Sequence, residues 1–431
     1  PPLRWVDFSL MAALGWASWK ILSPLSKPAA LFGFSLFCLL YWINGGEFAL
    51  ERDVLALVLA VIAFAFACDN EHSLSKIISI GTFAAIACSM KPNTVVIVPV
   101  LLWMLYSQAV SNHRKLTAIS LFLITIIFVL LTPFVWISLN GGLDSFSDIY
   151  RHYMPIYANS RYDLYHYENS TERWTTLFAQ YLQYGGVSLL LAAPGLIWVW
   201  ILNPKNTLAH KRILQLAVVN FAFTFYEVIA GKFWLNHMFP SAYWSFICCS
   251  LLLTTPNNNA KIWKKILAII FIIPCVFLSL FIADKTLSSM TLAHNNEKLE
   301  PMFWRARQVA VYLKSQHLQP DDTVQVLDMA GDGQAALLMA QATSATRFLI
   351  DVPLWMEPNA TETQTLRKNF LQELQQKNPI FIVYFEQFLH PGGGNRLKEF
   401  KPLYEWITTH YEAAEQREAA YTIYRRKTVA Q

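Results

Sequence analysis

Residues 116–139 read LTAISLFLITIIFVLLTPFVWISL, and this run of 24 residues contains no charged side chain. A helix of about 20 apolar residues is long enough to span the hydrocarbon core of a membrane. Nine further apolar stretches, several of them short, lie at 5–22, 28–43, 54–68, 77–90, 94–107, 181–202, 213–230, 238–254 and 262–283. The sequence therefore predicts an all-α polytopic membrane module, with about ten transmembrane helices, in residues 1–285.

The composition also indicates a chain that lies largely in lipid. Hydrophobic residues make up 55% of the 431 residues and charged residues only 15%, whereas about one quarter of a soluble domain is charged. All six cysteines fall inside apolar stretches. We interpret them as small buried residues, which predict neither a disulfide framework nor a metal site. The net charge of +5 is modest, and no nucleic-acid partner is expected.

The basic loops predict how the chain is oriented, because short loops rich in Lys and Arg stay on the cytoplasmic side. Such loops occur at 113–115, 205–212 and 261–265, and Lys20 and Lys27 flank another. They alternate consistently with the other loops if Pro1 and the C-terminal region both lie outside the cytoplasm. We therefore expect a multi-pass protein of the bacterial inner (plasma) membrane, with its active face and C-terminal domain in the periplasm.

Residues 140–173 are too polar to span a membrane. Six tyrosines are mixed there with basic residues that include Arg151 and His152. Amphipathic aromatic side chains with basic neighbours suit the headgroup layer of a bilayer. This pattern predicts interfacial helices along the outer surface, and an ordinary membrane-facing loop remains the alternative.

From about residue 296 to residue 431 the composition is that of a small soluble α/β domain. Helical patterns at 302–316, 365–376 and 395–410 alternate with strand-like apolar runs at 324–327, 347–350, 379–385 and 420–424. Gly331-Asp332-Gly333 follows the first of these runs. It lacks the full glycine spacing of a nucleotide-binding turn, so we interpret it as an ordinary turn.

Two clusters of donor groups lie at span ends on the predicted outer side. Residues 231–240 read GKFWLNHMFP, which brings Lys232, Trp234 and His237 into one short loop. Aromatic rings stack on sugars, and charged donors hold phosphate. Lys91 precedes Pro92 at another span end, where a lysine is able to hold a lipid phosphate as a point charge. A snorkelling lysine and an aromatic belt with a helix break are the alternative interpretations.

Acidic groups gather on the same side. Glu47, Arg52 and Asp53 stand together at a span start, where a free carboxylate could act as a base or bind a metal. A solvated loop with local ion pairs is the alternative. Glu227 lies near the outer end of its span, and a carboxylate is costly in lipid, so Glu227 is a further candidate.

Several of these motifs together resemble those of the GT-C superfamily, the polyprenyl-phosphate-sugar-dependent glycosyltransferases. This superfamily includes the protein mannosyltransferases and the lipid A aminoarabinose transferases, and the likeness is to a bacterial branch. The matching segments are Pro1-Pro2-Leu3, residues 50–53 (LERD), Lys91-Pro92 and residues 232–240. The resemblance covers about residues 1–285. The chain departs from the branch at Phe233 (Gly in the branch), Asn236 (Tyr) and Asp53 (His).

The resemblance implies transfer of a sugar from a polyprenyl-phosphate donor, with inversion, to an envelope glycan, lipid or protein acceptor. The resemblance and the donor-group clusters together give six candidates for donor binding: Lys91, Arg151, His152, Lys232, Trp234 and His237. In the family the principal catalytic aspartate lies in the first outer loop. That loop should precede Pro1, so we expect the first span and this loop upstream and assign no catalytic residue in this chain. The scheme requires no cofactor, and the sequence offers no convincing metal-ligand set.

Other function classes make different predictions. A flippase or transporter for a lipid-linked sugar would distribute polar residues along a path through the bilayer and carry an internal repeat. An O-antigen ligase or polymerase would carry one large outer loop rather than a C-terminal α/β domain. A sensor whose C-terminal domain binds a partner would need no clustered outer motifs. The concentration of polar motifs on one side favours an enzyme acting at that membrane face.

Overall fold

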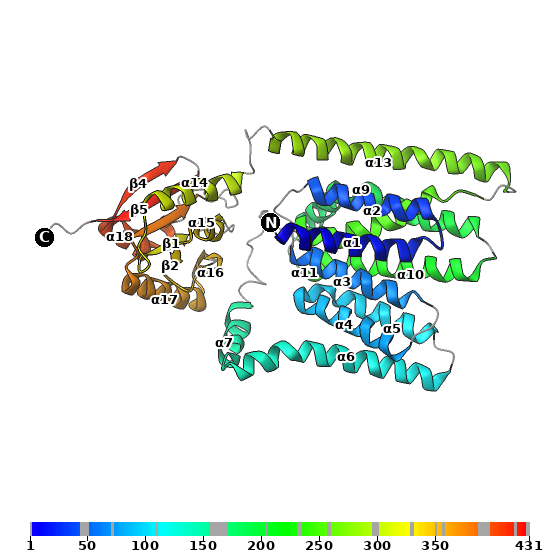
Figure 1. Ribbon diagram of the computed structural model, residues 1–431, viewed down its shortest axis with the longest axis horizontal. Helices are drawn as coiled ribbons and strands as arrows, with labels where there is room; N and C mark the ends of the chain where they lie inside the picture. Colours follow the sequence, from blue (N-terminus) through cyan, green and yellow to red (C-terminus); the bar gives the residue numbers. More distant parts are fainter. Residues whose placement is uncertain are drawn as a thin grey trace. The chain divides into compact units, whose positions relative to one another are not determined.

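The computed structural model divides the chain into two compact units, each described here by itself (Figure 1). The helical unit contains Pro1–Leu143 and Tyr167–Met290, and the α/β unit contains Asp144–His166 and Thr291–Gln431. The described residues are 2–43, 51–69, 73–108, 111–154, 170–203, 205–230, 235–256, 260–294, 301–327, 332–349, 351–355, 358–386, 397–417 and 420–427.

The helical unit consists of long helices that run side by side (Figure 1). They are α1 (Pro2–Leu22), α2 (Lys27–Ile43), α3 (Arg52–Ala67), α4 (Leu74–Met90), α5 (Ile97–Gln108), α6 (Asn112–Leu139), α9 (Ser170–Leu202), α10 (Thr207–Thr224), α12 (Leu235–Ser250) and α13 (Ile262–His294), with the short helix α11 (Tyr226–Ala230). Two 3-10 segments, η2 (Pro92–Val96) and η4 (Leu251–Leu253), precede α5 and follow α12.

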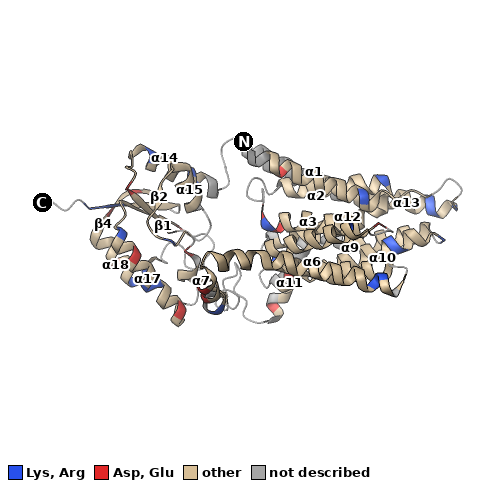
Figure 2. Ribbon diagram, turned by 60° about the horizontal axis from the view of Figure 1, so that its bottom comes forward, with Lys and Arg blue, Asp and Glu red and all other residues tan. Residues whose placement is uncertain are grey.

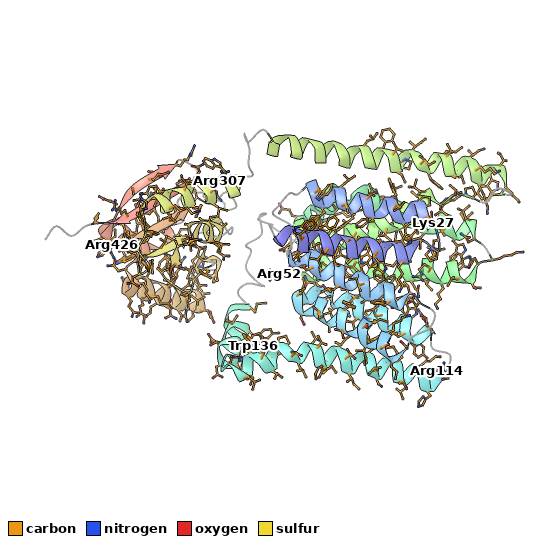
Figure 3. All side chains as sticks on the ribbon, viewed as in Figure 1. Lys27, Arg52, Arg114, Trp136, Arg307 and Arg426 are labelled. Atoms are coloured by element: carbon orange, nitrogen blue, oxygen red, sulfur yellow. The ribbon has the colours of Figure 1, made fainter. Side chains whose placement is uncertain are left out.

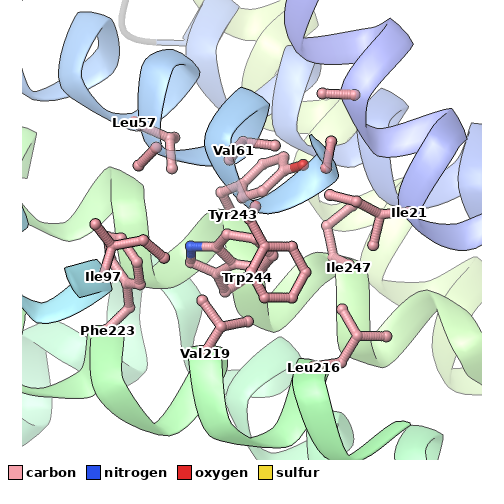
Figure 4. Packing of buried hydrophobic residues seen from close by; sticks show 14 of the residues in the cluster. Ile21, Leu57, Val61, Ile97, Leu216, Val219, Phe223, Tyr243, Trp244 and Ile247 are labelled. Atoms are coloured by element: carbon pink, nitrogen blue, oxygen red, sulfur yellow. The ribbon is translucent and has the colours of Figure 1, made fainter. Parts of the chain in front are cut away.

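Helix α12 forms the centre of this unit. Its residues from His237 onward are buried, as expected for a helix that is covered by neighbours on every side. Figure 4 shows its side chains Tyr243, Trp244 and Ile247 packed with Ile21, Leu57, Val61, Ile97, Leu216, Val219 and Phe223. These residues come from helices far apart in the sequence, so α12 packs with α1, α3, α5 and α10 in one core.

Small residues let the helices around α12 approach it closely. A Cβ atom added at Gly195 of α9 would lie 2.1 Å from the carbonyl oxygen of Cys248. One added at Gly33 of α2 would lie 2.8 Å from Oγ of Ser250. Glycine is therefore required at Gly195 by the backbone of α12 itself rather than by a movable side chain.

Helices α6 and α13 present apolar side chains outward. Ile124, Ile127 and Phe128 of α6 are exposed, and so are Ile269 and Phe277 of α13. By length and composition, one helix in the described part of the chain, His113–Leu139, is able to cross a membrane on its own. Shorter apolar helices lie at Lys27–Trp42, Leu74–Met90, Pro92–Gln108, Leu190–Leu202 and His237–Leu253. Helix length thus does not confirm the ten predicted spans, and that number stays a prediction.

Positive charge gathers at one end of the helical unit, here named the basic end, where α6, α10 and α13 begin (Figure 2). Its described cations are Lys20, Lys27, Lys76, Arg114, Lys115, Lys205, Lys211, Arg212, Lys261, Lys264 and Lys265. Among the residues that the structure describes, Asp69 is the one carboxylate at this end. Figure 3 shows Lys27 and Arg114 at the basic end and Arg52 at the opposite end, here named the site end.

The α/β unit contains a mixed five-stranded sheet in the order β2-β1-β3-β5-β4. The strands are β1 (Thr323–Leu327), β2 (Thr343–Ser344), β3 (Phe381–Phe385), β4 (Tyr411–Arg417) and β5 (Tyr421–Arg426). β1 is parallel to β2 and β3, with Val324 opposite Phe381, whereas β5 is antiparallel to β3 and β4, with Ile382 opposite Tyr424. The prediction of a small α/β arrangement is confirmed in this coarse sense.

Helices cover both faces of this sheet and give the unit two cores. The helices are α14 (Pro301–Ser315), α15 (Asp332–Ala340), α16 (Val352–Trp355), α17 (Thr361–Lys377) and α18 (Lys401–His410). Ile382 and Tyr384 of β3 pack in the core that contains Trp355, whereas Phe381 and Val383 pack in the core that contains Leu313. Successive residues of a strand point to opposite faces, so all of β3 is buried.

Three details of the α/β unit differ from the sequence prediction. Asp332 and Gly333, interpreted as part of an ordinary turn, begin helix α15. Residues 347–349 of the apolar run are not a strand: the chain bends here, and the Thr346 hydroxyl donates to Gln325 Oε1 and accepts from the Phe348 N–H. The edge strand β4 was not predicted, because Glu412, Glu415 and Gln416 give it the polar composition of a loop. Charged residues are common on sheet edges, where they oppose aggregation.

Of the predicted interfacial stretch 140–173, the structure describes helix α7 (Leu143–Asp148), a π-helical turn at Ile149–Tyr153, and the start of α9. Described side chains there, such as Ile149 and Tyr150, are exposed. Residues 155–169 lie outside the described part. The interfacial role stays a prediction.

Candidate functional site

Lys91 lies at the junction between α4 and η2, at the site end. Its backbone is extended (φ −144°, ψ 105°), because the ring of Pro92 disfavours the helical conformation in the preceding residue. The Lys91 N–H still donates to the Ala87 carbonyl, and its own carbonyl accepts from Thr94. This break directs the lysine into the bundle: its side chain is 13% exposed, and Nζ lies 2.8 Å from Oδ2 of Asp53.

Asp53 is the partner that holds Lys91. It lies in the first turn of α3, where the helix dipole favours a negative charge, and its side chain is 0% exposed. Its other oxygen, Oδ1, accepts a hydrogen bond of 2.6 Å from the Tyr226 hydroxyl. Both carboxylate oxygens therefore have partners, which a buried ion pair requires.

His237 approaches the same ammonium group from α12. Its Nε2 lies 3.1 Å from Lys91 Nζ, and its side chain is buried. A lysine ammonium group only donates hydrogen bonds, so in this contact Nε2 of His237 is the acceptor. Two of the three hydrogens of Lys91 are used in these contacts with described residues.

Glu227 completes the cluster. It lies in α11, next to Tyr226, and is buried. The Ser241 hydroxyl donates to Glu227 Oε1, whereas Oε2 has no hydrogen-bond partner in the part of the chain that the structure describes. Ser241 follows His237 by one helical turn, so both lie on the same face of α12. Side chains from α3, the α4–η2 junction, α11 and α12 thus form one buried polar cluster, Asp53, Lys91, Tyr226, Glu227, His237 and Ser241.

This cluster combines two kinds of group. Lys91 and His237 are held where a cation and an imidazole can meet an anionic ligand such as a phosphate. Glu227 supplies a buried carboxylate oxygen that can accept a hydrogen bond from a hydroxyl group. In the described part of the chain, no group of three or more His, Cys, Asp or Glu side chains is arranged to hold a metal ion.

Four of the predicted site residues meet in this cluster: Asp53, Lys91, Glu227 and His237. Arg52 precedes Asp53 but its side chain is exposed. Arg151 belongs to the α/β unit and is also exposed.

The other predicted site residues fall outside what the structure describes. They are Glu47, Lys232, Trp234 and the side chain of His152. Their roles stay predictions.

Sequence reasoning did not nominate Tyr226 and Ser241. Tyr226 carries a signal that could have found it, since it precedes a carboxylate, Glu227, near the end of a predicted span. Ser241 carries a weaker signal, its spacing of one helical turn from His237. The contact of each with a carboxylate depends on helices that are distant in sequence, and no local pattern predicts it.

No protein-family model matches the sequence, and no curated protein matches it either. The structure is similar to the crystal structure of ArnT from Cupriavidus metallidurans in the apo state, with a TM-score of 0.55 and 11% sequence identity over 98% of this chain and 82% of ArnT. It also matches the Archaeoglobus fulgidus oligosaccharyltransferase complex with Zn and sulfate, with a TM-score of only 0.43 and 9% identity over 87% of this chain and 54% of that one. The likeness to ArnT shows that the chain has a GT-C-like fold, as the motifs predicted.

Proposed function

We propose that this protein with a GT-C-like fold is an integral membrane glycosyltransferase that transfers a sugar from a polyprenyl-phosphate donor to an envelope glycan, lipid or protein acceptor. The observation that carries the proposal is the buried Asp53–Lys91 ion pair with His237 at 3.1 Å from the same ammonium group. Burial of a charged pair costs free energy. A cation kept at one end of an apolar bundle despite this cost suits the binding of an anionic substrate group.

A location in the membrane is supported by the outward apolar faces of α6 and α13 and by the basic end. Basic loops remain in the cytoplasm, so the proposed orientation places the site end at the periplasmic face. A donor that has reached that face carries its own leaving group, the polyprenyl phosphate. The reaction therefore needs no nucleotide outside the cytoplasm.

In the proposed reaction an acceptor oxygen attacks the anomeric carbon, the bond to the phosphate oxygen breaks, and the configuration inverts. Negative charge grows on the departing phosphate. The third hydrogen of Lys91 would donate to a phosphate oxygen, and Asp53 and His237 would hold the ammonium group in position for it. Stabilisation of developing charge by preorganised groups is often the largest catalytic contribution. The acceptor hydroxyl gives its proton to a general base.

The proposal is tested by removing the charge of Lys91 without leaving Asp53 unpaired. The double substitution Asp53→Asn with Lys91→Gln keeps two polar side chains of similar shape. A charge-assisted hydrogen bond contributes about 1.5–3 kcal/mol, which corresponds to about a tenfold to hundredfold change in rate. We expect the double variant of the full-length protein to fold. We expect it to transfer radiolabelled sugar from a polyprenyl-phosphate donor about tenfold to hundredfold more slowly than the wild-type protein.

Lys27→Gln is the matched control, because Lys27 is an exposed cation at the basic end. It should leave the transfer rate unchanged. An unchanged transfer rate in the folded double variant would show that Lys91 does not contribute to the reaction. A wild-type protein that moves the lipid-linked sugar across proteoliposomes without transferring it would support a flippase instead.

A further inference from the structure

Two buried side chains of α10 at the basic end each have one nitrogen without a hydrogen-bond partner among the described residues. Arg212 is 7% exposed; its Nη2 donates to the Cys68 carbonyl at 2.7 Å, and its Nη1 has no partner. Gln215, almost one turn further along α10, is 1% exposed. Its Oε1 lies 4.0 Å from the Cys68 thiol, and its Nε2 has no partner. Both side chains therefore meet the end of α3 at the same residue.

The charge of Arg212 is not balanced by a carboxylate among the described residues. Asp69, which follows Cys68, accepts from Lys20 at 3.0 Å and from Lys76 at 2.7 Å. A buried guanidinium group that has an unsatisfied N–H and no carboxylate partner among the described residues favours an anionic ligand.

We propose that Arg212 and Gln215 bind a phosphate oxyanion, that of an acidic phospholipid headgroup, between α3 and α10. A guanidinium and an amide N–H together supply donors that match phosphate oxygens. A buried water molecule would satisfy a donor but not the charge. Basic pockets between membrane helices on the cytoplasmic side suit such headgroups. Lys20 and Lys76, about one quarter exposed, would attract the anion to the entrance. This site is separate from the Lys91 cluster, and its occupant does not react.

The test measures the melting temperature of the delipidated full-length protein in a detergent without phosphate. Phosphatidylglycerol, phosphatidylcholine and sodium phosphate are titrated in separate arms. We expect phosphatidylglycerol to raise the melting temperature more than phosphatidylcholine does. Arg212→Gln should weaken the affinity for phosphatidylglycerol about tenfold or more, and Gln215→Leu should weaken it a few-fold. A specific shift with sodium phosphate, lost in Arg212→Gln, would assign the same oxyanion site to a soluble source.

Arg114→Gln is the matched control, since Arg114 is an exposed arginine at the same end, and it should change the affinity less than twofold. If Arg212→Gln fails to fold, Gln215→Leu and native mass spectrometry of phospholipid retained by the wild-type protein decide the question. The proposal is overturned if the substitutions in α10 and the Arg114 control bind phosphatidylglycerol equally. It is also overturned if the wild-type protein retains no acidic phospholipid and responds to none of the three ligands.

Discussion

Asp53 accepts a hydrogen bond at each carboxylate oxygen, from Lys91 on one side and from Tyr226 on the other. The two contacts have different consequences. The ion pair keeps the ammonium group charged inside an apolar bundle, whereas the tyrosine fixes the orientation of the carboxylate. A buried ion pair often contributes little net stability to a fold, so the value of this arrangement lies in where it places Lys91 Nζ.

Tyr226→Phe tests this positioning role. The substitution leaves Asp53 Oδ1 without its described hydroxyl donor, and loss of a hydrogen bond to a charged group costs about 1.5–3 kcal/mol. We expect a lower melting temperature and a transfer rate at least about fivefold below that of the wild-type enzyme, because Lys91 Nζ is no longer held in one position. Thermal denaturation and initial-rate measurements on the same preparation check both effects.

Tyr243→Phe is the control for Tyr226→Phe. Tyr243 is also buried, and its hydroxyl lies 2.8 Å from Oγ of Ser18 in the core of the helical unit. Its loss should lower stability by about 1 kcal/mol and leave the transfer rate per folded molecule unchanged. Equal effects of the two substitutions on that rate would contradict a positioning role for Tyr226.

At the scale of elements, the packing of α9 against α12 determines where His237 and Ser241 stand. The two helices touch along their length, and they can do so because Gly195 leaves room for the Cys248 carbonyl. Since α12 carries two members of the site cluster, a change in this packing would move them relative to Lys91 and Glu227.

Gly195→Ala should therefore be strongly destabilising. The added methyl group would meet backbone that cannot rotate away, and overpacking of this kind costs about 1–3 kcal/mol or more. Gly15→Ala is the control: its Cβ would meet the ring of Phe34 at 2.9 Å, which is a side chain that can shift. Both substitutions gain about 1 kcal/mol of helix propensity, so the difference in melting temperature between them reports the backbone clash. Equal melting temperatures would show that α9 and α12 are further apart than the structure places them.

At the scale of the whole molecule, charge is distributed unevenly between the two ends of the helical unit. This asymmetry predicts which end faces the cytoplasm. The basic end gathers eleven described Lys and Arg residues against one described carboxylate. The α13 helix begins at this end and runs to the other. If the basic end stays in the cytoplasm, the α/β unit, which follows α13 in the chain, lies outside it.

Fusion of alkaline phosphatase to the chain tests this orientation. A fusion after Asn296 should be enzymatically active, because the phosphatase folds only outside the cytoplasm, whereas a fusion after Lys205 should be inactive. Equal expression of the two fusions, checked by immunoblotting, is needed for the comparison. The opposite pattern of activity would reverse the orientation and remove the proposed access of Lys91 to a periplasmic donor.

The sequence by itself predicted the GT-C-like fold and much of the local structure. The 24-residue apolar run at 116–139 lies within α6, and Lys91-Pro92 ends a helix, because helix length and the restriction before proline are properties of the chain itself. The apolar runs at 324–327, 379–385 and 420–424 became strands for the same local reason. The edge strand β4 escaped prediction because its polar residues resemble those of a loop and only its pairing with β5 makes it a strand.

Only the tertiary structure decided which of the candidate polar residues lie together in one buried cluster. Asp53, Lys91, Glu227 and His237 were each candidates, but from sequence a solvated loop remained an alternative for Asp53, a snorkelling side chain for Lys91, and an aromatic belt with a helix break for His237. Asp53 and Lys91 are 38 positions apart, and Lys91 and His237 are 146 apart. The central packing of α12 against α3 and its neighbours brings these positions together. That packing depends on the joint fit of side chains from many helices, whereas a sequence pattern records only the preferences of one segment at a time.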